Sequence, residues 1–118
     1  AGIDQNDTEA DILYGAKKVS NLKIFPNEKE DFSSSIIDSG KLVLVISQFT
    51  LLAKTSKGSK PSFSRAADRV KAKKLFSYFL EELASLGIKV ETGVFGAHMQ
   101  VNSINDGPVT LLIDSKSK

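Results

Sequence analysis

Apolar residues recur at helical spacing in two segments of the chain. The first begins after Thr8, which stands three residues before Asp11 in the pattern of a capping box, and it ends near Asn21. The second runs from about residue 65 to residue 86, and Gly87 follows it at the position of a C-cap glycine. Its apolar stripe comprises Ala72, Phe76, Phe79, Leu83 and Leu86. Both patterns predict amphipathic helices that bury one face.

Other segments have the composition of β-strands. Residues 41–52, KLVLVISQFTLL, are almost continuously apolar and rich in β-branched side chains, so we expect a strand buried on both faces. A shorter strand at residues 21–25 is ended by Pro26, whose ring cannot donate to a ladder. Further strands are expected at residues 88–96, 97–105 and 109–114. This order predicts a mixed α/β fold of α+β character, with a sheet covered by two helices.

The 118 residues, 41% hydrophobic and 25% charged, have the length and composition of one soluble domain spanning residues 1–118. No apolar run is long enough to cross a bilayer, and the lack of cysteine excludes disulfides and thiolate metal sites. His98, the single histidine, has no partner at metal-ligand spacing. We therefore expect a cytoplasmic protein without a metal or another cofactor. The tail at residues 116–118 is expected to be disordered.

Basic residues are concentrated in one segment. Eight of the sixteen lysines and arginines lie between residues 54 and 74 with a single acid, Asp68, whereas the rest of the chain holds eight bases and thirteen acids. The eight are Lys54, Lys57, Lys60, Arg65, Arg69, Lys71, Lys73 and Lys74. Such a segment attracts a polyanion, because Coulomb attraction adds along a patch. A solvated loop and helix face is the alternative that charge alone leaves open.

Conventional catalytic groups are sparse. The hydroxyls of Ser47, Thr50 and Thr110 are candidate nucleophiles, but each needs a neighbouring base, and His98 is the only histidine. The spacing of these residues does not favour a Ser-His-acid triad. The residues alone therefore assign no reaction.

The segment NDGPVT, residues 105–110, interrupts strand-like residues with a turn. Gly107 tolerates backbone conformations that other residues resist. The bond before Pro108 adopts the cis form at a cost of only about 0.5 to 1 kcal/mol. A corner between two strands accounts for this composition, which by itself assigns the turn no chemistry.

Four motifs, in this order and spacing, resemble those of the D-aminoacyl-tRNA deacylase family. They are SQFTL at 47–51, PSF at 61–63, ETGVFGAHMQV at 91–101 and NDGPVT at 105–110. The resemblance extends from about residue 2 to residue 115. It implies the family's fold, a mixed, largely antiparallel sheet or barrel covered by two helices, and a homodimer that binds the 3′ end of aminoacyl-tRNA. It also implies hydrolysis of the ester of D-aminoacyl-tRNA, and of glycyl-tRNA mischarged on tRNA(Ala), with rejection of L-aminoacyl esters.

The resemblance also implies roles for individual residues. Backbone N–H groups would line the catalytic pocket and stabilise the oxyanion formed when water attacks the ester, with the 2′-hydroxyl of the tRNA assisting in place of a protein base. These groups belong to Ser47, Gln48, Phe49 and Thr50. Gly107 and Pro108 would form a Gly-cisPro element that enters the other subunit's pocket and excludes an L side chain. Further pocket-lining residues would be Phe95, Ala97, Met99 and Thr110, and tRNA would contact Lys54, Lys57, Lys60 and Arg65.

The chain departs from the family's pattern in two places. Family members begin with a hairpin that carries a basic QRV-like strand, and no such hairpin precedes the segment that starts at Gly2, so we expect a domain shortened at its N-terminus. In the basic loop, SKGSKPSF has lysines and serines where the family often has arginine. Lysine keeps the charge but lacks the bidentate fork suited to phosphate.

Three alternatives stay open at this point. Thr50 could act as a covalent nucleophile, which is chemically weaker because no base adjoins its hydroxyl. A relative of the same fold carries a trans Gly-Pro and acts on L-alanyl mischarged tRNA, although Phe49 in SQFTL favours the D-specific branch. A non-catalytic domain of this fold could also bind the aminoacylated 3′ end without turnover.

Overall fold

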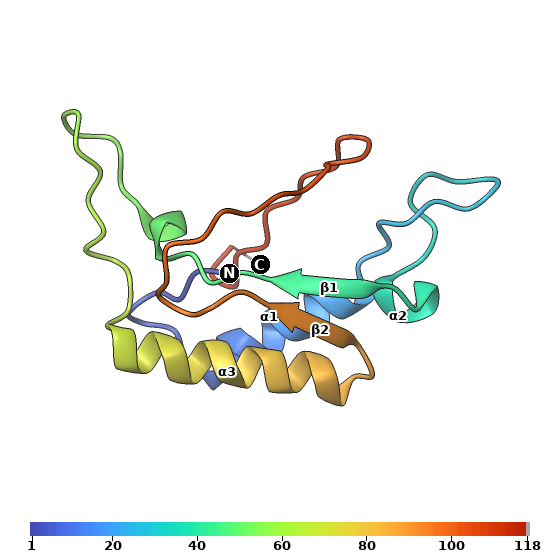
Figure 1. The fold of residues 1–118 in the computed structure, drawn as a ribbon, viewed down its shortest axis with the longest axis horizontal. Helices are drawn as coiled ribbons and strands as arrows, with labels where there is room; N and C mark the ends of the chain where they lie inside the picture. Colours follow the sequence, from blue (N-terminus) through green and yellow to red (C-terminus); the bar gives the residue numbers. More distant parts are fainter. Residues whose placement is uncertain (118) are drawn as a thin grey trace.

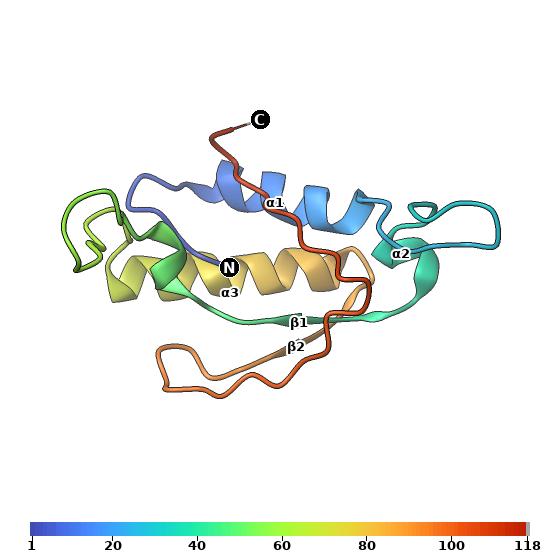
Figure 2. The same cartoon turned by 90° about the horizontal axis from the view of Figure 1, so that it is seen from above.

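The structure, a computed structural model, describes residues 1–117 and combines helices with a small sheet (Figure 1). The elements are α1 (Glu9–Asn21), α2 (Ile36–Ser39), β1 (Leu42–Val45), the 3-10 helix η1 (Phe49–Leu52), α3 (Arg69–Ser85) and β2 (Lys89–Thr92). The two long helices, α1 and α3, pack against each other, and Figure 2 shows both on the same side of the two strands. The mixed helix-and-strand fold class is confirmed.

Both long helices are confirmed, and their ends follow from capping groups. α1 has the predicted capping box at Thr8. α3 begins four residues later than expected, because the Asp68 carboxylate caps it by accepting the N–H of Lys71 at 2.9 Å. Gly87, with a φ of 84°, ends α3 as predicted. The single turn α2, which no apolar period indicates, is capped by Ser35.

β1 and β2 pair in parallel, with Leu42 opposite Lys89. Parallel strands need a long crossover connection, and α3 provides it. β1 is only four residues long, because the chain turns into η1 within the segment 41–52, for which the sequence predicts one strand. Leu42 and Leu44 are 62% and 56% exposed while Val45 is buried. The expected burial of both strand faces is therefore wrong, since no second layer covers the outer face within residues 1–117.

Three other predicted strands are not formed in the described part of the chain. In residues 21–25 only Phe25 pairs, through an isolated antiparallel bridge to Ser34. Residues 97–105 and 109–114 form no strand, because no neighbouring strand offers them a ladder of hydrogen bonds. Within residues 1–117, antiparallel pairing is confined to three isolated bridges. The regular sheet in residues 1–117 is thus a parallel pair, smaller than the largely antiparallel sheet or barrel that was expected.

The core lies between the two long helices and the strand face that points towards them. Its main cluster comprises Ala16, Ile36, Val45, Phe76, Leu83 and Ile88. A second cluster of Ile3, Ile12 and Leu75 joins the start of the chain to α1 and α3. Phe76 and Leu83 confirm the predicted apolar stripe of α3, whereas Leu86 at its end is 43% exposed. Among residues 1–117, no helix has the length and apolar character needed to span a bilayer.

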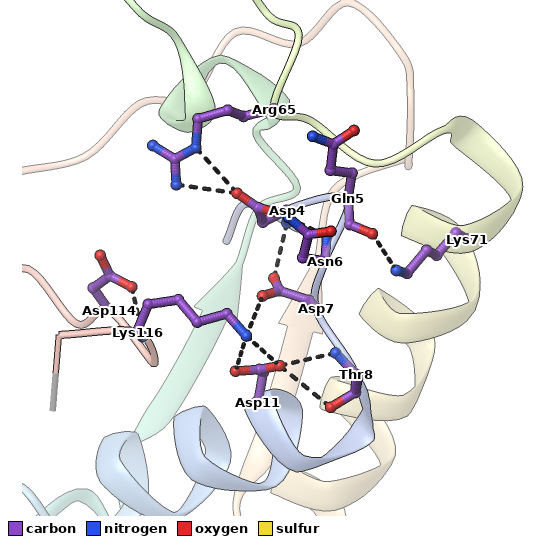
Figure 3. A network of polar contacts seen from close by, with 10 residues as sticks. All are labelled: Asp4, Gln5, Asn6, Asp7, Thr8, Asp11, Arg65, Lys71, Asp114 and Lys116. Carbon is purple, nitrogen blue, oxygen red and sulfur yellow. Dashed lines mark hydrogen bonds and ion pairs between the residues drawn. The ribbon is translucent and has the colours of Figure 1, made fainter.

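A network of carboxylates and cations ties the end of the chain to the start of α1 (Figure 3). The Lys116 Nζ donates to both carboxylate oxygens of Asp11 at 2.9 Å and lies 3.7 Å from Oδ1 of Asp7. The hydrogen bond from Lys116 holds the pKa of Asp11 well below its usual range, and the same bond raises the pKa of Lys116. Burial raises the pKa of Asp7. The expected disorder at residue 116 is therefore wrong, and residue 118 lies outside the described residues.

The Lys116–Asp11 pair predicts a defined pH window of stability. Because the pKa of Asp11 is lowered on folding, its contribution is present above the ordinary carboxyl pKa of about 4 and is lost as pH falls through the folded value. Because the pKa of Lys116 is raised, its contribution is present below the ordinary lysine pKa of about 10.4 and is lost as pH rises through the folded value. Lys116→Gln should therefore lower the free energy of unfolding most between about pH 5 and 9.

Urea unfolding of wild type and Lys116→Gln at a series of pH values measures this difference. Lys116→Arg, which keeps the charge, is the matched control and should stay close to wild type. A Lys116→Gln difference that is the same at pH 3 and pH 7 would contradict the assignment.

Candidate active site

A cavity of about 510 Å³ lies where the chain leaves β1 and β2. Because the two strands are parallel, their carboxyl ends lie at the same end of the sheet, and the segments that follow them leave the sheet there. One wall is residues 46–49, the second is residues 95–99, and the third is the start of α3. Of the predicted site residues, the cavity brings together Ser47, Gln48, Phe49, Phe95, Ala97 and Met99.

The turn from β1 into η1 is held by the first residue of the chain. The N–H of Gln48 donates to the Ala1 carbonyl at 2.8 Å, and the Ala1 amino group donates to the Ile46 carbonyl at 2.7 Å. The N–H of Gln48 is therefore already bonded. Phe49 and Thr50 begin η1, so no carbonyl within that helix accepts their N–H groups. Of these two residues, Phe49 lines the cavity and Thr50 does not.

Aromatic contacts fix the two sides of the site. The rings of Phe49 and Phe63 meet edge to face with centroids 5.1 Å apart, which joins the SQFTL motif to PSF. The ring of Phe95 lies 5.7 Å from that of the buried Phe76. The cavity wall after β2 is thus anchored on the core through α3.

The hydroxyls and the histidine do not assemble into a nucleophilic site. The Thr50 hydroxyl accepts a hydrogen bond from the side-chain amide of Gln48, and Thr50 does not line the cavity. His98 lies in the cavity wall, but no hydrogen bond among residues 1–117 joins its ring to Ser47 or Thr50. The chemistry available to the cavity from these groups is hydrogen bonding, without a base beside a nucleophile.

The NDGPVT turn lies outside this cavity. The bond between Gly107 and Pro108 is cis, and Gly107 has a φ of 134°. The side chain of Asn105 closes the turn, since its Oδ1 accepts the N–H of Val109 and its Nδ2 donates to the Thr110 hydroxyl, both at 2.9 Å. Figure 1 shows the segment after residue 101 running out to an exposed loop that stands away from the helices. Gly107, Pro108 and Thr110 therefore do not meet the SQFTL motif of their own chain.

The basic segment divides into residues with and without partners. Lys54 pairs with Ser62 through two backbone hydrogen bonds of 2.8 and 2.9 Å, which closes an exposed loop carrying Lys57 and Lys60. Arg65 is engaged instead, because its Nη2 and Nε donate to Oδ2 of Asp4 at 3.0 and 3.2 Å (Figure 3). A hydrogen bond to the N–H of Asn6 and the Arg65 contact lower the pKa of Asp4. None of these four cations lines the cavity.

Sequence reasoning gave no site role to several residues that line the cavity. They are Ala67, Arg69, Ala72 and Phe76 near the start of α3, and His98 after β2. The only sequence signal for Arg69 is its place in the basic segment, which does not distinguish it from its neighbours. Its position in the cavity depends on the contact between α3 and β2, which the number and spacing of charged residues do not predict.

Comparison with known proteins supports the motif resemblance. Residues 1–114 match the family model described as D-Tyr-tRNA(Tyr) deacylase. The D-aminoacyl-tRNA deacylase of Caldicellulosiruptor bescii is 50% identical over 115 residues, which cover 98% of this chain and 77% of that protein. That of Koribacter versatilis is 45% identical over 117 residues, covering 99% of this chain and 78% of that protein.

Solved structures agree with this relationship. The c-Myc DNA Unwinding Element Binding Protein superposes with a TM-score of 0.86 at 36% identity, covering 94% of this chain and 76% of that chain. A probable eukaryotic D-amino acid tRNA deacylase superposes with a TM-score of 0.69 at 15% identity, covering 83% and 72%, which shows a likeness of fold. The chain therefore belongs to the D-Tyr-tRNA(Tyr) deacylase family.

Proposed function

We propose that the chain hydrolyses the ester bond of D-aminoacyl-tRNA and releases free tRNA and the D-amino acid. As a member of this family the chain is a hydrolase that acts on aminoacyl-tRNA, and the finer steps are our inference. The observation that carries the proposal is that SQFTL and GVFGAHM both contribute residues to the lining of one cavity. This cavity would hold the terminal adenosine and its ester.

The proposed chemistry uses backbone donors and not a protein nucleophile. Water adds to the ester carbonyl carbon, and the N–H group of Phe49, a residue that lines the cavity, stabilises the resulting oxyanion. The intermediate then collapses, the carbon–oxygen bond to the ribose breaks, and the ribose oxygen takes a proton. The 2′-hydroxyl of the substrate assists the proton transfer, as the resemblance implies. The absence of a base beside Ser47 or Thr50 in residues 1–117 supports this assignment.

We further propose that Gly107 and Pro108 act in the cavity of a second copy of the chain. Two observations support a homodimer. The turn lies outside the cavity of its own chain, and large apolar side chains that are exposed to solvent in the single chain flank it. These are Ile104, Leu111 and Leu112.

A backbone element at that place would select chirality by exclusion. The turn would leave no room for an L side chain and would accept a D-aminoacyl ester without contacting its side chain. A glycyl ester on tRNA(Ala) would pass, because glycine has no side chain to exclude. Phe49 of SQFTL favours this D-specific branch over the relative that acts on L-alanyl esters.

We propose that the tRNA stem approaches over the basic loop. Lys54, Lys57 and Lys60 are exposed there, whereas Arg65 already binds Asp4 and would first have to release it. Contacts of this kind weaken as salt rises, because binding releases counterions from the phosphates.

The experiment that tests the proposed function compares hydrolysis of labelled D-Tyr-tRNA and L-Tyr-tRNA by the purified chain. We expect release of D-tyrosine and little release of L-tyrosine. Protection of the D-ester from spontaneous hydrolysis, without turnover, would instead support the alternative of a non-catalytic binding domain.

Thr50→Ala should keep most of the deacylase activity. The Thr50 hydroxyl accepts from Gln48 and has no adjacent base, so its removal should lower kcat on D-Tyr-tRNA by no more than about threefold. Loss of a covalent nucleophile would instead lower kcat by roughly a thousandfold or more. Such a loss, with an unchanged circular dichroism spectrum, would make Thr50 the nucleophile.

Gly107→Ala should weaken the discrimination between D and L esters. A Cβ at this φ of 134° would lie 3.0 Å from Cγ2 and 3.1 Å from the backbone nitrogen of Val109, so the turn must deform. We expect the ratio of kcat/KM for D over L to fall by at least about tenfold.

Gly40→Ala is the matched control for backbone strain. Gly40 also has a positive φ, 65°, but a Cβ there would meet nothing within 4 Å, and the residue lies at the end of α2. The control should keep the wild-type ratio. A folded Gly107→Ala with undiminished discrimination would end the role proposed for this turn.

A further inference from the structure

We propose that Arg69 is a substrate-positioning residue that binds the phosphate of the terminal adenosine at the tRNA 3′ end. The proposal rests on the proposed function, since it assigns a contact to the same substrate in the same cavity. Arg69 is the first residue of α3 and lines the cavity together with SQFTL and the segment after β2. The start of α3 and the turn after β2 lie at the same end of the molecule in both views (Figures 1 and 2).

The guanidinium of Arg69 lies against Gly96 and leaves its donors free. A Cβ built on Gly96 would lie 3.0 Å from both Nη1 and Nη2 of Arg69 and 3.1 Å from its Cζ. The fork therefore packs directly against Gly96, in space that exists because this residue is glycine. No hydrogen bond or ion pair among residues 1–117 involves the Arg69 guanidinium, in contrast to Arg65. The planar fork of Arg69 therefore keeps all its donors available for a ligand in the cavity.

The composition of the cavity favours an anion. Among the residues that line it there is no aspartate, glutamate or lysine, so Arg69 faces no carboxylate there. Asp68, its neighbour in sequence, is occupied as the N-cap of α3 and accepts the N–H of Lys71. An arginine without a carboxylate partner, beside an apolar wall, binds planar oxyanions and phosphates bidentately.

The chemistry of the substrate identifies which anion this is. In an aminoacyl ester the carboxyl group of the amino acid is uncharged, and the α-amino group is a cation that arginine repels. The anions that remain are the phosphodiesters of the tRNA. The phosphate nearest the ester is attached to the 5′-oxygen of the same ribose that carries the ester. A bidentate contact to it would fix that ribose and orient the ester towards the N–H group of Phe49.

The test separates phosphate recognition from catalysis. Binding of 5′-AMP and of adenosine is measured by NMR titration for wild type, Arg69→Gln and Arg69→Lys. Wild type should bind 5′-AMP about tenfold more tightly than adenosine, since a charge-assisted hydrogen bond is worth about that factor or more. Arg69→Gln should lose this preference and Arg69→Lys should keep part of it. Lys17→Gln, the same loss of charge on an exposed part of α1, should leave the preference unchanged.

The same variants are then assayed with the 3′-D-tyrosyl esters of 5′-AMP and of adenosine. Arg69→Gln should lower kcat/KM about tenfold for the AMP ester and leave the adenosine ester within about twofold. Equal binding of 5′-AMP and adenosine by wild type, or an unchanged preference in folded Arg69→Gln, overturns the proposal. An Arg69-dependent preference in a protein that hydrolyses neither D-ester would leave this proposal standing and reject the proposed function.

Discussion

The parallel pairing of β1 with β2 is the constraint on which the rest of the structure depends. Parallel strands have their carboxyl ends at the same end of the sheet, and the segments that follow them start there. SQFTL and GVFGAHM therefore meet although they are distant in sequence. The pairing also requires a crossover, and α3 supplies it. The first turn of that helix then closes the third wall of the cavity. One choice of strand direction thus brings three separate segments to a single site.

The helices were predictable from the sequence because their signals are local, whereas the strands were not. Thr8, Asp68 and Gly87 mark helix ends through contacts within a few residues. The segment 41–52 has strand propensity throughout, yet Ala1 takes the carbonyl of Ile46 and the N–H of Gln48, and the chain turns there. That contact spans 45 residues. Strand propensity indicates only which conformation a segment can adopt. A strand also needs a partner strand for its backbone hydrogen bonds, and residues 97–105 and 109–114 have none within residues 1–117.

The motif residues that line the candidate site could be predicted from the sequence, whereas the arginine that lines it could not. Ser47, Phe49 and Phe95 meet at the cavity as the resemblance implies, because such a site is built from backbone and apolar surface. Side-chain chemistry could not have located it, since no base adjoins a nucleophile there. The turn at Gly107 does not reach the cavity of its own chain, and the second copy into which we propose that it reaches cannot be located from the sequence of one chain.

Charge counting treats Arg65 and Arg69 alike, and the structure separates them. Arg65 binds Asp4, a residue 61 positions away, so most of its field is cancelled at longer range. Arg69 packs against Gly96 with its donors free. The exposed lysines of the loop act through a Coulomb field that salt screens beyond roughly 8 to 10 Å. The roles proposed for the two groups differ accordingly: the lysines would attract tRNA at long range, and Arg69 would fix the last nucleotide, because a directional contact inside the cavity depends on geometry and not on the net charge of the patch.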